Sequence, residues 1–147
     1  MDREVIEQKL ESLRRCLQRI TDKCPPDSET LGRDIDLQDI ITLNLTRAVQ
    51  LCVDMGAHLI AGMEVPPPNT MGQTFDTLAK AGIIGENLAV QLKKAVGFRN
   101  VAVHNYEEID WVIVHTIARH HLGDFTEFAK VIVSKLTSGT AKGSDSK

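Results

Sequence analysis

Residues Gly97–Tyr106 read GFRNVAVHNY, and the pattern of the surrounding chain can be traced outward from them. Taken as a helix at about 100° per residue, the segment from residue 88 onward has one apolar face. That face consists of Leu88, Leu92, Ala95, Val96, Ala102 and Val103. Arg99 lies at the centre of the same face. A charged side chain in such a place needs a partner, a ligand or an interface, so Arg99 is a candidate functional residue.

The stretch also carries the spacing R-x4-H-x-Y, formed by Arg99, His104 and Tyr106. Histidine is the side chain whose ordinary pKa allows proton transfer near neutral pH. Arginine presents a planar fork of donors that matches the oxygens of a phosphate group. Together the two side chains could act on a phosphodiester without a metal ion.

This spacing resembles the signature of the HEPN domains, small all-helical proteins of which many are metal-independent ribonucleases. Asn100, directly after the arginine, and Tyr106, two positions after His104, narrow the resemblance to the HepT-like toxins of bacterial toxin–antitoxin pairs. The resemblance covers residues 1–137 and implies an all-α, up-and-down bundle of four to five helices that forms a homodimer. We expect the remaining tail, 138–147, to be disordered because its residues are small and polar.

The resemblance also implies an activity and a partner. Such a toxin is a metal-independent endoribonuclease that cleaves RNA, for example tRNA or mRNA, and leaves a 2′,3′-cyclic phosphate. Arg99 and His104 would be catalytic, Asn100 would orient the substrate or the backbone, and neither a metal nor a cofactor would take part. The partner would be a minimal nucleotidyltransferase antitoxin, which neutralises the toxin by adding AMP to Tyr106 and holds it in a larger complex.

Two other interpretations remain open at this point. In the first, the chain is a non-catalytic helical module that binds a nucleotidyltransferase and helps to present its substrate. In the second, the chain is a monomeric bundle with neither activity, in which Arg99 is paired internally and the motif residues have only a structural role.

The relative directions of the motif side chains set a geometric condition. On one straight helix, His104 points about 140° away from Arg99, whereas Tyr106 lies about 20° from it. For Arg99 and His104 to act together, either the helix must loosen or end before His104, or copies from two subunits must converge. The resemblance favours the second arrangement, with both motifs lining one shared groove.

Composition is consistent with a single helical domain. The chain has 147 residues, of which 42% are hydrophobic and only 4% aromatic, so the core must be built mainly from aliphatic side chains. The three cysteines, Cys16, Cys24 and Cys52, form no C-x-x-C pair and indicate neither a disulfide framework nor a zinc site. The charged N-terminus has no apolar signal region, and no apolar run is long enough to span a bilayer. We therefore expect a cytoplasmic protein.

The net charge of −3 argues against broad affinity for nucleic acid, because general nucleic-acid binders are usually basic. RNA chemistry would have to use a local basic cleft, for which Lys93, Lys94, Arg99 and Arg119 are candidates. Lys93 and Lys94 are equally consistent with an ordinary solvated helix face.

Apolar periodicity and turn residues predict the helices and their connections. A first helix is expected from Asp2 to about Asp22, followed by a loop over Pro25–Arg33. Further helices are expected over Asp34–Ala61, over Gly72–Ala81 and from Glu86 through the motif. A last helical stretch should follow Tyr106 and kink or split at Gly123-Asp124.

The second long helix carries a polar stripe, which consists of Arg47, Gln50, Asp54 and His58. One interpretation is an exposed face with an Asp54–His58 pair four residues apart. The other is that Asp54 faces Arg99 and His104 and supports them. The sequence does not choose between these interpretations.

Overall fold

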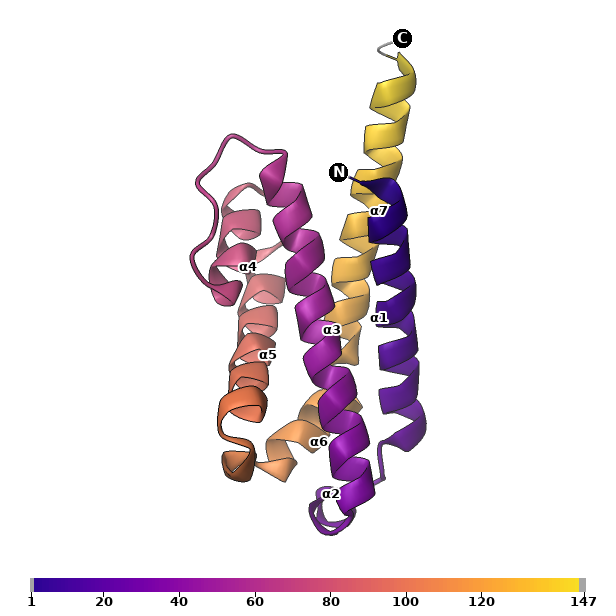
Figure 1. Ribbon diagram of the computed structural model, residues 1–147, viewed down its shortest axis with the longest axis vertical. Helices are drawn as coiled ribbons and strands as arrows, with labels where there is room; N and C mark the ends of the chain where they lie inside the picture. Colours follow the sequence, from indigo (N-terminus) through magenta and orange to yellow (C-terminus); the bar gives the residue numbers. More distant parts are fainter. Residues whose placement is uncertain (1, 146–147) are drawn as a thin grey trace.

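The computed structural model describes residues 2–145, with side chains through residue 138, and contains seven α-helices and one short 3-10 turn in that range (Figure 1). The elements are α1 (Arg3–Lys23), α2 (Ser28–Arg33), α3 (Ile35–Ala61), α4 (Met71–Lys80), α5 (Glu86–His104), η1 (Tyr106–Glu108), α6 (Trp111–His120) and α7 (Leu122–Asp145). The predicted all-α class is confirmed, since no strand occurs in the described part of the chain.

Side-chain caps fix where several helices begin. The Asp2 carboxylate accepts a hydrogen bond from the Val5 backbone N–H at the start of α1, and the Asp34 carboxylate does the same for α3. The Thr70 hydroxyl caps α4, directly after the proline-rich connection. Each of these caps satisfies a backbone donor that the first helical turn leaves unpaired, which explains why the predicted helix starts are correct to within about one residue.

The long helices run up and down, and α3 is the central one (Figure 1). It lies between α1 on one side and α5 on the other, and it contacts every other α-helix. Helix α4 can approach α3 closely because Gly56 has no side chain at the crossing. A Cβ atom at Gly56 would lie 2.8 Å from Cγ2 of Thr74 on α4. The predicted bundle of long helices is thus present, with short helices added at its ends.

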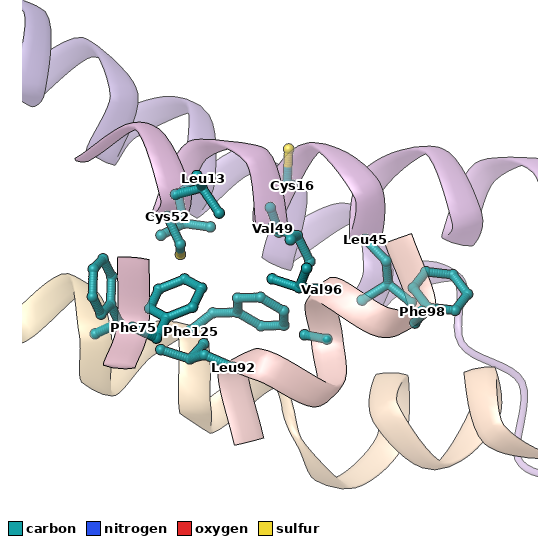
Figure 2. Close-up of a cluster of buried hydrophobic side chains, with 14 of the residues drawn as sticks. Leu13, Cys16, Leu45, Val49, Cys52, Phe75, Leu92, Val96, Phe98 and Phe125 are labelled. Atoms are coloured by element: carbon teal, nitrogen blue, oxygen red, sulfur yellow. The ribbon is translucent and has the colours of Figure 1, made fainter. Parts of the chain in front are cut away.

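The core lies between α1, α3, α4, α5 and α7 and is mainly aliphatic (Figure 2). Its largest fully buried side chains are Phe75, Phe125 and Phe128. The rings of Phe75 and Phe128 pack edge to face, with centroids 5.6 Å apart, a favoured arrangement for aromatic pairs. Cys52 is fully buried, and burial raises the pKa of its thiol well above the ordinary range, as expected for a core cysteine.

The structure corrects the predicted loop over Pro25–Arg33, because this segment contains the helix α2. The Asp27 side chain caps α2 by accepting a hydrogen bond from the Thr30 backbone N–H at 2.8 Å. Leu31 anchors α2 in the core, where it is completely buried. An N-cap aspartate followed by a buried leucine is enough to hold one and a half helical turns in place.

The predicted split of the last helical stretch is confirmed, although the break lies earlier than expected. Helix α6 ends at His120 and α7 begins at Leu122, so the chain breaks at His121 and not at Gly123-Asp124. Helix α7 then continues to Asp145, beyond residue 138 where the disordered tail was expected. The side chains of 139–147 lie outside the described residues, and the domain boundary at 137 stays a prediction.

Within residues 2–145, no helix combines the length and the apolar character needed to cross a bilayer.

Candidate functional site

Arg99 lies on α5 and is half-buried, as expected for an arginine on the apolar face. Its Nη1 donates a hydrogen bond to Oδ1 of the neighbouring Asn100 at 3.3 Å. Among the side chains described, no carboxylate lies within salt-bridge distance of this guanidinium. The single chain therefore leaves most of the donor fork of Arg99 available, and the internal ion pair of the bystander interpretation is not observed.

The apolar face around Arg99 is not fully covered by the chain's own helices. Leu92, Ala95 and Ala102 are buried as predicted, but Val103, predicted on the same face, is 52% exposed. Val103 lies in the last turn of α5, at the end of the bundle, where no other helix covers it. The C-terminal part of the α5 apolar face thus remains open around Arg99.

His104 is the last residue of α5 and is exposed. The helix is continuous from Glu86 through His104, so the first of the two arrangements, a helix that loosens or ends before His104, is not observed. Along an unbroken helix, Arg99 and His104 point about 140° apart. Within one chain the two side chains are therefore not directed at a common point.

Tyr106 lies in η1, directly after α5, and its ring is 41% exposed. Its hydroxyl donates a hydrogen bond to Oδ1 of Asp39, near the start of α3, at 2.8 Å. Its ring contacts Trp111 edge to face, with centroids 6.1 Å apart. These two contacts hold η1 against α3 and α6. Asp39 is a site residue that the sequence did not indicate.

The environment of Tyr106 raises the pKa of its hydroxyl above the ordinary value. Partial burial is the largest cause, followed by the hydrogen bond to Asp39 and the negative charge of that carboxylate. The nearby Thr42 hydroxyl acts in the opposite direction, although this buried group forms no hydrogen bond of ordinary geometry with a described residue. Tyr106 is consequently held in its neutral form at physiological pH.

Replacement of Asp39 by alanine should lower the pKa of Tyr106. The change removes the charge and the acceptor that disfavour the phenolate, while the partial burial remains. Tyr106 is the only tyrosine in the chain, so the near-ultraviolet absorbance of the phenolate reports this one group. We expect a titration midpoint above 10 in the unsubstituted protein and a lower midpoint in Asp39→Ala. Identical midpoints would show that Asp39 does not contact the hydroxyl in solution.

Neither interpretation of Asp54 agrees with the structure of the single chain. Its Oδ1 accepts a hydrogen bond from Gln50 Nε2 at 2.9 Å, and its Oδ2 lies 3.4 Å from Nζ of Lys9 on α1. No ion pair joins it to His58, Arg99 or His104 among the described side chains. Asp54 therefore links α3 to α1, on the side of α3 away from the motif. The periodicity identified its polar stripe but not the helix that the stripe faces.

The predicted basic cleft does not form within one chain. Lys93 is paired with Asp76 on α4, at 3.1 Å, as the interpretation of a solvated helix face anticipates. Arg119 lies on α6, where it lines a different groove together with Cys24. Lys94 is exposed on α5, but it lies five residues before Arg99 and points about 140° away from it.

Two histidines outside the motif, His115 and His121, have structural contacts. Nε2 of His115 lies 2.8 Å from the carbonyl oxygen of Pro25 and joins α6 to the loop after α1. Nδ1 of His121 lies 3.4 Å from Asp124, next to the break between α6 and α7. Across the described residues, no three His, Cys, Asp or Glu side chains are grouped so as to hold a metal ion.

Comparison with known proteins agrees with this geometry. Residues 6–132 match the model of the family described as "Ribonuclease HepT-like". The chain belongs to the HepT-like ribonuclease family. This assignment confirms the resemblance inferred from Arg99, Asn100, His104 and Tyr106, and it accounts for the all-helical bundle.

Individual members of the HepT-like family are similar over half or more of this chain. The mRNA nuclease HepT of Shewanella oneidensis is 36% identical over 129 residues, which is 88% of this chain and 96% of the relative. The tRNA nuclease HepT of Aphanizomenon flos-aquae is 31% identical over 74 residues, half of each chain. A solved structure of the tri-AMPylated Shewanella oneidensis HEPN toxin in complex with an MNT antitoxin superposes with a TM-score of 0.83 at 35% identity. The match covers 91% of this chain and 99% of that toxin.

Proposed function

We propose that this chain is the toxin of a toxin–antitoxin pair and that it cleaves RNA without a metal ion. The observation that carries the proposal is the R-x4-H-x-Y motif at the end of α5. There Arg99 has no carboxylate partner among the described side chains, and His104 is exposed. Family membership supports the same reaction, since the similar proteins are named as nucleases of mRNA and tRNA. Which RNA this chain cleaves is left to the experiment below.

The active site would be shared by two subunits of a homodimer. Arg99 and His104 diverge along the continuous helix, so a site that contains both must draw them from different chains. The open face of α5 supports this arrangement, because Val103 is exposed there. Beside it, a groove of about 320 Å³ between α5 and α6 has the exposed Val112 and Ile113 in its wall. Exposed aliphatic side chains around a half-buried arginine are typical of a surface covered by a partner.

The reaction follows from the chemistry of the two side chains. The 2′-oxygen of the RNA attacks the adjacent phosphorus while the bond from phosphorus to the 5′-oxygen breaks, which yields a 2′,3′-cyclic phosphate and a free 5′-hydroxyl. His104 would carry a proton either from the 2′-hydroxyl or to the leaving oxygen. Arg99 would stabilise the negative charge that grows on the phosphoryl oxygens. Asn100, which accepts a hydrogen bond from Arg99, would restrict the orientation of the guanidinium.

Modification of Tyr106 by a nucleotidyltransferase antitoxin would be the means of control. Transfer of AMP to the phenolic oxygen replaces its hydrogen, so the donor of the hydrogen bond to Asp39 is lost. The new phosphate also places a negative charge next to the Asp39 carboxylate, which repels it. Modified Tyr106 would therefore leave α3 and extend AMP toward the RNA-binding surface that contains His104, blocking it.

Cleavage in the presence of EDTA tests the proposed reaction. Freshly purified, unmodified protein should cut total RNA or isolated tRNA in EDTA, and the products should end in a 2′,3′-cyclic phosphate that resists phosphatase until acid opens the ring. If the unmodified protein leaves every RNA intact, with or without a divalent metal, the nuclease proposal fails. The chain would then be the non-catalytic module that binds a nucleotidyltransferase.

Co-expression with a minimal nucleotidyltransferase tests the proposed control. Intact-mass spectrometry should show additions in steps of one AMP group, and peptide mapping should assign them to Tyr106. The Tyr106→Phe variant keeps the ring against Trp111 but lacks the acceptor oxygen, so it should gain no AMP. Additions to the Phe variant would place the modification on another residue.

A further inference from the structure

A positively charged surface lies between α1 and α3, on the side of α3 away from α5. It is a groove of about 770 Å³ whose lining includes Arg14, Arg15 and Arg19 from α1 and Arg47 from α3. No acidic residue belongs to this lining. Four arginines gathered in one groove are unexpected in a chain whose net charge is −3. The sequence pattern did not indicate the groove, because its two walls come from helices that are separated in the chain by α2.

The charges in this groove are only partly compensated by neighbouring acids. Arg14 and Arg15 share one carboxylate, that of Glu11, at 2.7 and 3.3 Å. For Arg19 and Arg47, no ion pair with a described side chain is formed. Arginines held near one another without matching carboxylates repel each other and favour binding of a polyanion.

The groove leads toward the end of the bundle that holds the motif. Its α3 wall includes Ile40 and Leu51, a length of about 17 Å along the helix axis. Ile40 directly follows Asp39, the residue that binds the Tyr106 hydroxyl at 2.8 Å. Along the axis of α3, the groove therefore reaches the level of the contact that positions η1, while Ile40 and Asp39 point about 100° apart around the helix.

We propose that the α1–α3 groove binds the phosphate backbone of the RNA substrate, at a distance from the residues that cleave it. This inference rests on the proposed ribonuclease function, because that function identifies the bound polyanion as RNA. Guanidinium groups match phosphate oxygens with two parallel hydrogen bonds. No aromatic side chain lines the groove, so it lacks a platform for stacking bases and would hold RNA without regard to sequence.

The lining favours RNA over a protein partner. Leu43 is the one large hydrophobic residue of the lining that is clearly exposed among the described side chains, at 48%. The centre of a protein interface usually contains several buried apolar or aromatic side chains and few charges. The apolar surface suited to a protein lies elsewhere, between α5 and α6.

Binding of a fluorescein-labelled, single-stranded RNA of mixed sequence tests this proposal directly. The measurement uses the His104→Ala background, so that the RNA is not cut, and follows fluorescence anisotropy at several salt concentrations. The groove variant is Arg19→Gln/Arg47→Gln, which removes two guanidinium groups without a carboxylate partner. The matched control is Lys130→Gln/Lys135→Gln, which removes two charges from exposed positions of α7 outside the groove. Circular dichroism and the urea midpoint verify that both variants fold.

The groove variant should weaken RNA binding about tenfold or more, and its dependence of log Kd on log salt should be shallower by about 1.4, as expected for two lost contacts to single-stranded phosphates. The control pair should change the Kd by less than about twofold, the effect of altered net charge alone. Equal weakening in both variants would overturn the proposal, because the effect would then be general charge. An unchanged Kd in the groove variant would also overturn it. If that variant instead lost the nucleotidyltransferase during co-purification, the groove would be a protein interface.

The same substitutions separate this proposal from the nuclease function. With His104 present, Arg19→Gln/Arg47→Gln should raise KM for RNA and leave kcat unchanged, because the groove binds substrate and transition state alike. If the unsubstituted protein binds RNA through the groove and never cleaves it, the proposed nuclease function is contradicted and the proposed RNA-binding groove is supported. If the groove variant cleaves RNA with an unchanged KM, only the proposal of an RNA-binding groove is contradicted.

Discussion

Alanine in place of His104 will lower the rate of metal-independent RNA cleavage by about 10²- to 10⁴-fold, the usual contribution of a general acid–base residue. Alanine in place of Arg99 will lower it by about 10²- to 10³-fold, because the charge on the phosphoryl oxygens loses its stabilising donor. Both side chains meet solvent and neither is fully buried, so the variants should remain folded. The measurement is the initial rate of cleavage of one labelled RNA in EDTA, with protein in excess.

His120→Ala is the control for these substitutions. His120 is also an exposed histidine at the end of a helix, on α6, and has no place in the proposed reaction. Its rate should stay within about twofold of the unsubstituted protein, as for an ordinary surface substitution. Cleavage by His104→Ala at the same rate as by His120→Ala would remove His104 from the mechanism.

Alanine in place of Phe128 will lower the free energy of unfolding by about 3 to 5 kcal/mol, as typical for deleting a buried phenyl ring. Phe128 is completely buried and packs edge to face against Phe75. The cavity would open between α7, α4 and the Gly56 turn of α3, where the helices are closest. This cost is a large part of the 5 to 15 kcal/mol that a domain usually has.

Urea unfolding followed by the fluorescence of Trp111, the only tryptophan, measures this loss. Protein concentration must be equal in all samples, since formation of the proposed dimer would add to the apparent stability. Phe128→Leu, which retains most of the apolar volume, should cost clearly less than the alanine variant. A loss below about 1 kcal/mol for alanine would mean that the α4–α7 contact contributes little to the core.

Local sequence signals were sufficient to predict most of the fold. Aliphatic residues at helical spacing predicted the long helices, and capping residues such as Asp34 and Thr70 lie within a residue of the observed starts. The signal for α2 was present but too short to stand out: Asp27 is an N-cap, and Leu31 is the single residue that anchors the helix. A helix of this length is held by its tertiary contact and not by its own propensity.

The motif residues could be read from the sequence, whereas their partners could not. Arg99, His104 and Tyr106 are within eight positions of one another, but Asp39 is 67 positions from Tyr106. Periodicity assigns Asp39 and Asp54 to the same helix without showing which neighbouring helix each one faces. That choice depends on how α1 and α5 are arranged around α3, and in the single chain the Asp54 carboxylate pairs with Lys9 of α1.

The exposure of Val103 likewise could not be predicted from the sequence pattern. Its position on the apolar face of α5 predicted burial, but the bundle ends before it and leaves it open. Periodicity shows that Val103 lies on the apolar face of α5 next to Arg99. It cannot show whether the folded chain covers that face or leaves it exposed. The exposure of this face is also the feature that supports a second subunit at the site.

Activity of a mixed dimer tests the sharing of the site between subunits most directly. Arg99→Ala and His104→Ala chains with different affinity tags are co-expressed, and the dimer that carries both tags is isolated. If each site takes Arg99 from one chain and His104 from the other, one of the two sites is intact, and the mixed dimer should have about half of the unsubstituted activity. If the mixed dimer is as inactive as either single variant, the two side chains act within one chain and the account of a shared site is contradicted.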